Sequence, residues 1–279
     1  MGLNKKLGLG SVQFGVKYGI ANKKDKTNAT EVSKILLRAK EYGINLIDTA
    51  PAYGNAEYVL GKNNLKNFKV VSKFFPSEDK GPLLTQIERS LTDLGVKSLY
   101  GYLAHRPLEL LESESDWTDL LALKKEKLVE KIGFSLNSPC ELEELLEKQL
   151  IPDLIQIPFN LFDGRFRKYA LSLKRQGCEI HTRSSFLQGL FFTDVDNLPS
   201  FFDEVKDEIN KLQQTFGDQL PGALLTYALR QEFIDYVIIG VDDEDQFLKN
   251  LNFMKESITN IESNITIPEN ILMPSNWPK

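Results

Sequence analysis

Four ionisable side chains are the residues of this chain most able to do chemistry, and each stands at or just after a β-like run. Asp48 and Tyr53 follow one such run, Lys73 ends the next, and His105 follows the third. The run before Asp48, residues 44–47, is short, apolar and continuous, as in a buried parallel strand. A carboxylate at the end of such a strand needs a partner, because burying an unpaired charge is costly. We therefore expect these groups to meet at one end of a sheet, where they could hold and transfer protons.

The elements that position these groups are short β-branched runs, which alternate with segments of helical period and show no Ser/Gly-rich linker. This alternation is typical of one parallel α/β domain. We expect strands at residues 7–10, 44–47, 68–73, 98–104, 129–135, 154–157, 179–182 and 236–239. We expect helices at residues 28–43, 56–61, 83–94, 115–127, 141–146, 202–216, 222–230 and 244–254, and a loop from Ser11 to Asn22.

Eight such units predict a (β/α)8 TIM barrel in a single domain, residues 1–279. Barrels of this kind commonly have about 250 residues and carry their functional groups at the carboxyl ends of the strands. All four ionisable side chains stand at that end. Beyond the last helix, Pro268, Pro274 and Pro278 exclude a continuing helix in the tail.

Composition narrows the class of protein. The net charge of −5 and the pI of about 5.3 give no global basic surface for nucleic acid or an anionic membrane. No apolar run approaches the roughly 20 residues of a membrane span, and we recognise no signal peptide. Cys140 and Cys178 have no metal-binding or redox spacing, so we expect buried thiols of a cytoplasmic protein. Two histidines cannot build a His-rich site, and we expect no metal.

Three motifs resemble the aldo-keto reductases. Their Asp-Thr-Ala-x-x-Tyr-Gly signature stands at residues 48–54, and the segments 72–73 (Ser-Lys) and 103–107 (Leu-Ala-His-Arg-Pro) follow in the same order. Residues 10–22 resemble a bacterial branch often associated with polysaccharide or modified-sugar biosynthesis. The resemblance implies reduction of a carbonyl by NADPH or NADH. It also implies a hairpin below the barrel, which must be short or missing because only Met1 to Lys6 precede the first strand.

The resemblance assigns a role to each of the four side chains. Tyr53 would be the general acid, with Lys73 favouring its ionised form, because an unperturbed tyrosine titrates near pH ~10. Asp48 would hold the ammonium of Lys73, and His105 would orient the substrate oxygen. Singly, each has a structural interpretation: a packed aromatic, a solvated charge, a cap and a core histidine. The occurrence of all four together, in motifs that follow the order of the family, favours the catalytic interpretation.

The resemblance also implies a set of cofactor-binding residues after the barrel strands. Arg183 stands where relatives carry an aromatic that stacks on the nicotinamide, and Leu136 stands where they carry an Asn, so that Asn137 would have to reach round. A simple strand-to-helix turn is the less favoured interpretation of the loop after the seventh strand. The candidates are Gln13, Ser135, Asn137, Gln156, Arg183, Ser184, Phe186, Gln188, Gly240, Asp242, Gln246 and Asn250.

The loop after the last strand bears on the choice of cofactor. It carries four acids at residues 242–245 and no cation before Lys249, whereas relatives usually hold the 2′-phosphate of NADPH there with a cation. A carboxylate repels a phosphate and suits a free ribose hydroxyl. This pattern predicts that NADH binds at least as well as NADPH. The alternative is that the acids only complement a helix N-terminus.

The substrate is weakly constrained by the sequence. The bacterial branch suggests a small-molecule carbonyl on a sugar or sugar nucleotide, and Lys17, Arg106 and Arg183 would suit an anionic substrate. In related reductases the tail passes over the barrel mouth, although packing outside the barrel is equally compatible with this sequence. Two other functions stay open: a slow or non-catalytic cofactor-sensing subunit, and a redox-neutral epimerase with bound cofactor. The oligomeric state is unknown.

Overall fold

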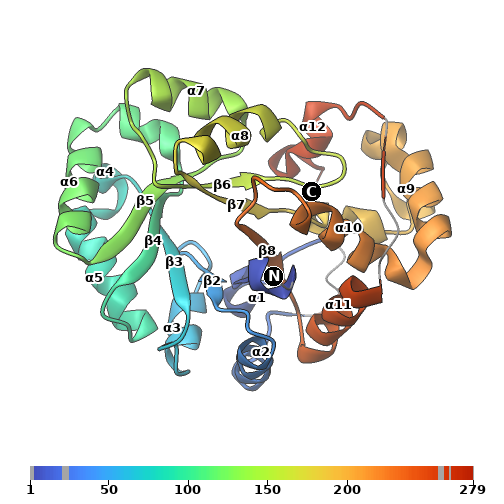
Figure 1. The fold of residues 1–279 in the computed structure, drawn as a ribbon, viewed down its shortest axis with the longest axis horizontal. Coiled ribbons are helices and arrows are strands. Elements are labelled where there is room, and N and C mark those ends of the chain that lie inside the picture. Colours follow the sequence, from blue (N-terminus) through green and yellow to red (C-terminus); the bar gives the residue numbers. More distant parts are fainter. Residues whose placement is uncertain (1–2, 21–24, 257–260, 264, 279) are drawn as a thin grey trace.

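The computed structural model describes residues 3–20, 25–256, 261–263 and 265–278. Eight parallel strands pair in chain order, and β8 pairs with β1 to close a barrel (Figure 1). This confirms the predicted (β/α)8 architecture. The strands are β1 (Leu7–Gly10), β2 (Leu46–Asp48), β3 (Lys69–Phe74), β4 (Leu99–Ala104), β5 (Val129–Ser135), β6 (Leu154–Pro158), β7 (Glu179–Arg183) and β8 (Tyr236–Gly240).

The helices lie around the outside of the strands, and α9 to α12 share one side of the molecule, on the right in Figure 1. Every predicted helix and strand is present, with ends within two residues of those expected. The helices are α1 (Val12–Gly15), α2 (Ala29–Glu41), α3 (Ala56–Gly61), α4 (Ser77–Lys80), α5 (Leu83–Leu94), α6 (Glu114–Lys125), α7 (Pro139–Glu147), α8 (Arg167–Arg175), α9 (Asp203–Phe216), α10 (Leu220–Leu229), α11 (Glu244–Glu256) and α12 (Glu269–Leu272).

Local sequence explains where the helices begin and end. The side chain of Asn28 accepts a hydrogen bond from the backbone N–H of Glu31, which caps α2 as predicted. Gly43, with φ +72°, turns the chain out of that helix. Three helices correct the sequence expectations: α1 lies in the segment expected to be a loop, and α4 and α8 were not anticipated. All three are short, at four, four and nine residues, so their periodicity is a weak signal.

The barrel is packed in two layers. Leu46, Val71, Leu103, Leu154 and Ile238 form a cluster inside the barrel, each at most 6% exposed. A much larger cluster fills the space between strands and helices. The interior is therefore a solid core, as in other barrels of this type, and it forms the floor on which the functional groups stand.

The amino end of the barrel carries a polar cluster. The carboxylate of Glu179 accepts hydrogen bonds from Tyr100 (2.7 Å) and Lys131 (2.8 Å), and lies 2.7 Å from Nε2 of His181. Burial works against the carboxylate, but these partners outweigh it and lower the pKa of Glu179 to about 2. Residues Leu3–Lys6 form a 3₁₀ turn at this end, with no hairpin among the described residues.

The tail packs against the α9 side of the molecule. Trp277 lies edge-on to Phe202, with ring centroids 5.1 Å apart, and its indole N–H donates to the carbonyl of Ile271 (2.9 Å). Glu269 pairs with Arg165 in the loop after β6 (2.6 Å). The prolines limit helix formation here to the single turn of α12, which agrees with the expectation of no continuing helix.

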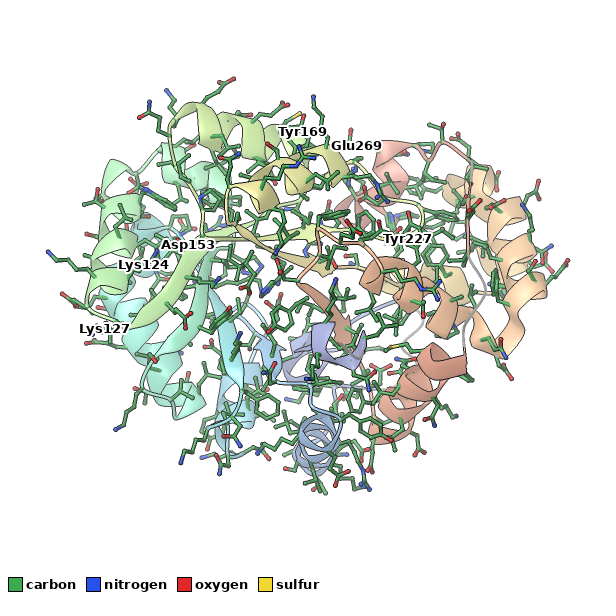
Figure 2. The ribbon with its side chains drawn as sticks, viewed as in Figure 1. Lys124, Lys127, Asp153, Tyr169, Tyr227 and Glu269 are labelled. Atoms are coloured by element: carbon green, nitrogen blue, oxygen red, sulfur yellow. The ribbon has the colours of Figure 1, made fainter. Side chains whose placement is uncertain are left out.

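Several surface features complete the fold. Lys124 of α6 pairs with Asp153 ahead of β6 (2.6 Å), which ties the helix to the sheet (Figure 2). Cys178 is buried as expected, and burial raises the pKa of its thiol to about 12. Cys140 is exposed, which corrects the expectation, because the first turn of α7 faces outward there. No helix within the described ranges is long and apolar enough to cross a membrane.

Candidate active site

Asp48 and Lys73 form a buried ion pair at the carboxyl ends of β2 and β3. The ammonium of Lys73 donates to both carboxylate oxygens of Asp48, at 2.7 and 2.9 Å, and to the carbonyl of Thr49 at 3.0 Å. Gln156 of β6 donates to the same carboxylate at 2.7 Å. Lys73 is 1% exposed, so this pair is tolerated only because further hydrogen bonds satisfy both groups.

The charge of Lys73 is secured by its neighbours. Burial is the largest single effect and would lower the pKa of this ammonium, but the charges of Asp48 and Tyr53 and hydrogen bonds to both residues together outweigh it. The net result is a pKa raised above the usual value of 10.5. Lys73 is therefore a permanent cation at the base of the site.

Tyr53 lies directly above this cation. Its ring centroid is 5.0 Å from Nζ of Lys73 and 6.0 Å from the ring centroid of His105, to which it is edge-on. The tight approach of α1 holds the turn in place, because a Cβ on Gly15 would lie 1.7 Å from the carbonyl oxygen of Tyr53. The hydroxyl-bearing ring is half-buried and lines a pocket.

His105 is a neutral imidazole. It stacks on Phe75, with centroids 5.5 Å apart, and burial lowers its pKa to about 3, assisted by the charges of Lys73, Arg183 and Arg106. Its Nδ1 is buried without a hydrogen-bond partner within the described chain. A neutral imidazole can donate from one nitrogen and accept at the other, so His105 is available to bind an oxygen atom.

A pocket of about 1070 Å³, open mouth included, runs from Tyr53 across the ends of β1, β7 and β8. Gly10 and Gly240 leave its floor without side chains, and a Cβ on Gly240 would clash with Gln13 at 2.3 Å. Ser11 and Gln13 each hold a buried oxygen that has no partner among the described residues. This groove, which has polar residues along its walls, fits a nicotinamide dinucleotide, which needs polar partners along its length.

The loop after β7 forms one wall of this pocket and has a strained backbone. Ser184, Leu187 and Gln188 have φ values of +65°, +44° and +52°, which L-residues rarely adopt. Gln188 also connects this loop to the loop after β1. Its side-chain amide donates to the hydroxyl of Tyr18 (2.9 Å), and its backbone carbonyl accepts from the backbone N–H of Ile20 (3.1 Å). Such strain collects at ligand-binding sites, so a bare strand-to-helix turn explains this loop less well.

The predicted cofactor residues fall into two groups. Eight of them line the pocket: Gln13, Arg183, Ser184, Phe186, Gln188, Gly240, Asp242 and Gln246. The other four are directed elsewhere. Ser135 contacts Gln156 (3.5 Å), Gln156 is committed to Asp48, Asn137 binds Arg183 and Asn250 is buried on α11. Contacts of Ser135, Asn137 and Gln156 with the nicotinamide, and of Asn250 with the adenosine end of the cofactor, stay predictions.

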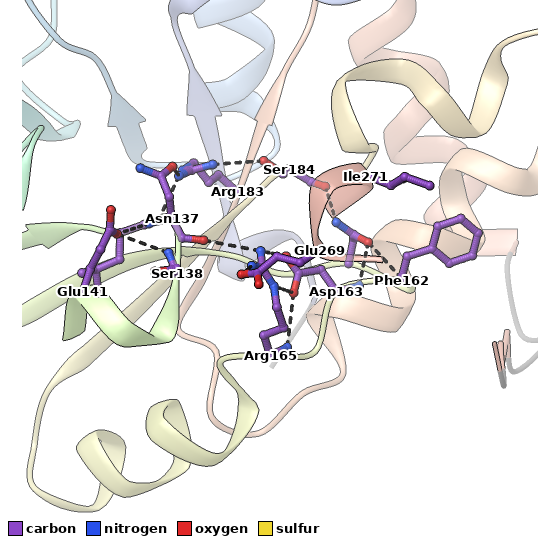
Figure 3. Close-up of polar contacts among 12 residues, drawn as sticks. Asn137, Ser138, Glu141, Phe162, Asp163, Arg165, Arg183, Ser184, Glu269 and Ile271 are labelled. Atoms are coloured by element: carbon purple, nitrogen blue, oxygen red, sulfur yellow. Dashed lines mark hydrogen bonds and ion pairs between the residues drawn. The ribbon is translucent and has the colours of Figure 1, made fainter. Parts of the chain in front are cut away.

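Arg183 extends from the end of β7 to the loop after β5. Its Nη2 donates to the carbonyl of Leu136 (2.9 Å) and to the side chain of Asn137 (2.7 Å), and its Nη1 lies 3.3 Å from the hydroxyl of Ser184 (Figure 3). Asn137 thus reaches the site through Arg183. The guanidinium lines the same pocket as Tyr53.

The acidic loop after β8 is only partly directed at the pocket. Asp243 caps α11 by accepting from the N–H of Gln246 (2.8 Å), and Glu244 pairs with Arg38 (2.6 Å). The helix-terminus interpretation therefore applies to Asp243. Asp242 and Gln246 line the pocket and are the two members of the loop placed to meet a nucleotide.

Sequence reasoning missed three polar side chains of the pocket: Ser11, Tyr18 and Ser185. Ser11 directly follows β1 and Ser185 follows β7 by two residues, so the strand-end rule that identified Asp48 could have found both. Tyr18 carries no comparable signal. The tail, by contrast, contributes no described residue to this pocket.

Comparisons with known proteins agree with this geometry. The model of the Aldo/keto reductase family matches residues 6–265. Methylglyoxal reductase DkgA of Salmonella typhimurium is 30% identical over 137 residues, which are 47% of this chain and 49% of that protein. The chain thus spans about half the length of the curated relatives it matches.

Solved structures share the fold. Aldo-keto reductase AKR11C1 of Bacillus halodurans in its holo form is similar with a TM-score of 0.70 and 20% identity, covering 92% of this chain and 88% of that one. Glycerol dehydrogenase AKR11B4 of Gluconobacter oxydans has a TM-score of 0.65 and 18% identity, with 94% and 95% covered.

Proposed function

Because the chain belongs to the aldo/keto reductase family, we propose that it reduces the carbonyl group of a small molecule with NADPH or NADH, with Tyr53 as the proton donor. One observation carries this proposal: Tyr53 lies against a permanently charged Lys73 and beside a neutral His105, in a pocket that fits a dinucleotide. The groups that the reaction requires are therefore together.

The bound nicotinamide supplies a hydride to the carbonyl carbon. Tyr53 donates its phenolic proton to the carbonyl oxygen, and the ammonium of Lys73 stabilises the phenolate that remains. Asp48 keeps that ammonium in place. Neutral His105 hydrogen-bonds to the carbonyl oxygen and stabilises the charge that develops there.

The proposals for the cofactor and for the substrate rest on different observations. Pocket residues Asp242 and Gln246 support binding of the free ribose of NADH, and binding of NADH at least as tight as that of NADPH is expected. For the substrate, the curated relatives are methylglyoxal reductases, which supports a small aldehyde. A sugar or sugar-nucleotide carbonyl and a cytoplasmic location rest on the sequence alone.

The test combines turnover with binding. Purified protein is assayed for oxidation of NADH and NADPH with methylglyoxal and glyceraldehyde, and each nucleotide is titrated by quenching of protein fluorescence. Tyr53→Phe is expected to abolish reduction and keep nucleotide affinity, because it removes the proton and little else. Tyr58→Phe, at an exposed tyrosine five positions along the chain, is the matched control and should behave as wild type.

Each outcome separates the rival functions. Turnover by Tyr53→Phe equal to wild type would refute the acid assignment. Nucleotide binding without reduction of any carbonyl would favour a cofactor-sensing subunit. A cofactor that copurifies and never accumulates in its other redox state would favour an epimerase. NADPH binding much tighter than NADH would refute the interpretation of Asp242.

A further inference from the structure

Arg183 is a cation of the pocket whose described partners are all neutral. The carbonyl of Leu136, the side-chain oxygen of Asn137 and the hydroxyl of Ser184 accept its hydrogen bonds. No carboxylate forms an ion pair with it among the residues that the structure describes. A guanidinium offers five N–H donors, so these three contacts leave donors for a ligand.

The other cations near the barrel mouth are neutralised or lie elsewhere. Arg106 pairs with Asp79 and with Glu109 (3.0 Å). Lys73 pairs with Asp48. Lys17 is exposed and does not line the pocket. Of the three cations that the sequence suggested for an anionic substrate, only Arg183 combines a pocket position with the absence of a described acidic partner.

Arg183 is also held in place by Asn137, which is itself fixed by two further hydrogen bonds. The backbone N–H of Asn137 donates to Glu141 (2.6 Å), and its carbonyl accepts from Arg165 (3.4 Å). Arg165 is in turn fixed between Asp163 (2.9 Å) and Glu269 (2.6 Å) (Figure 3). The guanidinium is thus preorganised, which reduces the entropy lost when it binds a ligand.

The fixed charge lies within range of the reacting groups. Arg183 and Tyr53 line one pocket, and the charge of Arg183 contributes to the lowered pKa of His105 after burial and Lys73. A molecule whose carbonyl reaches Tyr53 and His105 therefore stands in the positive field of Arg183. Neutral partners do not cancel that field, since they offset no charge.

We infer that the substrate is a carbonyl compound carrying an anionic group, a carboxylate or a phosphate, which Arg183 binds while Tyr53 receives the carbonyl oxygen. This inference rests on the proposed carbonyl reduction and names the substrate class of that same site. A charge-assisted, forked hydrogen bond from arginine suits either anion.

The experiment compares matched substrates that differ in the anionic group. Succinic semialdehyde is paired with butanal, and glyceraldehyde 3-phosphate with glyceraldehyde. Wild type should prefer the anionic member of at least one pair by about tenfold to hundredfold in kcat/KM, the range of a hydrogen bond to a charged group. The pair with the larger ratio identifies carboxylate or phosphate.

Variants assign that preference to Arg183. In Arg183→Gln the ratio should fall towards one, mainly through KM of the anionic member, and Arg183→Lys should keep part of it. Arg106→Gln is the control and should keep the ratio, because its charge is already offset by Asp79 and Glu109. Calorimetric binding of the products 4-hydroxybutanoate and glycerol 3-phosphate to the protein with NAD⁺ gives a readout independent of turnover.

The possible outcomes distinguish failure of this inference from failure of the proposed carbonyl reduction. Reduction of neutral and anionic aldehydes at equal kcat/KM, with no binding of either product, would overturn the inference and leave carbonyl reduction standing. If Arg183→Gln lowered kcat/KM equally for both members of a pair and also changed the ratio of NAD⁺ affinity to NADH affinity, Arg183 would act on the nicotinamide. That result would overturn the inference as well. Product binding that requires Arg183 would support it even in a protein with slow turnover.

Discussion

At the scale of single residues, two buried carboxyls show how environment sets charge. Asp48 is paired with Lys73, whereas Glu57 of α3 accepts hydrogen bonds from the hydroxyls of Ser72 (2.5 Å) and Ser90 (3.1 Å). Burial raises the pKa of Glu57, and its hydroxyl partners offset only part of the effect. The first carboxyl is held as a charge and the second is driven towards its neutral form.

The two carboxyls should therefore respond differently to amide substitution. Asp48→Asn leaves the ammonium of Lys73 buried without its counter-charge and is expected to lower the free energy of unfolding by about 3–5 kcal/mol. Glu57→Gln replaces a carboxyl by an amide of the same shape and should cost much less. Urea denaturation of both variants beside wild type measures the difference, and equal losses would contradict it.

Glu57 also predicts a pH dependence of stability. Because its folded pKa is raised above 4.5, it contributes stability below that pH and loses it as pH rises through the folded value. Glu57→Gln has no such titration, so its stability relative to wild type should rise as the pH increases from 4.5 through the folded pKa of Glu57. A constant difference across this range would contradict the raised pKa.

His105 makes a prediction about the reaction itself. With its pKa lowered to about 3, the imidazole stays neutral through the working range, and no step near pH ~6.5 from this residue is expected in the profile of kcat/KM. His105→Gln should reduce the rate by about a hundredfold or more without changing the shape of that profile. A step in wild type that disappears in His105→Gln would show that the histidine titrates during catalysis.

At the scale of elements, the contact of α1 with the turn before α3 positions Tyr53. Gly15 has no room for a side chain, since a Cβ would lie 1.7 Å from the carbonyl oxygen of Tyr53 and 2.8 Å from the N–H nitrogen of Ala56. The unanticipated helix α1 thus packs against the turn that carries Tyr53, the proposed proton donor.

Gly15→Ala tests this contact. Overpacking is expected to cost about 1–3 kcal/mol of stability and to lower kcat, because the Tyr53 turn must shift. Gly164→Ala is the matched control: a Cβ there meets nothing within 4 Å, so stability and kcat should stay at wild-type values. If both variants kept full activity, α1 would not position Tyr53.

At the scale of the whole molecule, the tail packs against the loop after β7, which forms one wall of the pocket, although no described residue of the tail lines the pocket itself. Trp277 is 9% exposed and packs with Phe202, Ile271 and Leu272 in a cluster distinct from the main core. The tail therefore lies near the barrel mouth, where Arg165 links it to the loop after β6, and none of its described residues lines the pocket.

Trp277→Ala should therefore separate stability from binding. Truncation of this indole is expected to lower the free energy of unfolding by about 3–5 kcal/mol, in line with other large-to-small substitutions in cores. Affinity for NADH, measured by fluorescence quenching at a temperature where the variant is folded, should match wild type. Lost affinity in a variant of full stability would mean that the tail shapes the pocket.

The sequence by itself determined the barrel and the positions of Asp48, Tyr53, Lys73 and His105. Strand and helix periods are local properties, and a parallel barrel necessarily brings the carboxyl ends of its strands to one face. Motifs at those ends therefore predict a shared site before any contact is known. The resemblance to the aldo-keto reductases further suggested Gln13, Arg183 and Asp242 as cofactor-binding candidates, and all three line the pocket.

Only the tertiary structure decided which partner each side chain has. Gln156 binds Asp48 across 108 positions, and Asn137 binds Arg183 across 46, so the described partner of each amide is distant in the sequence. The exposure of Cys140 and the contact at Gly15 are decided in the same way. The physical reason is that hydrogen-bond partners and packing clearances depend on distances between elements, which folding sets and which local sequence patterns do not contain.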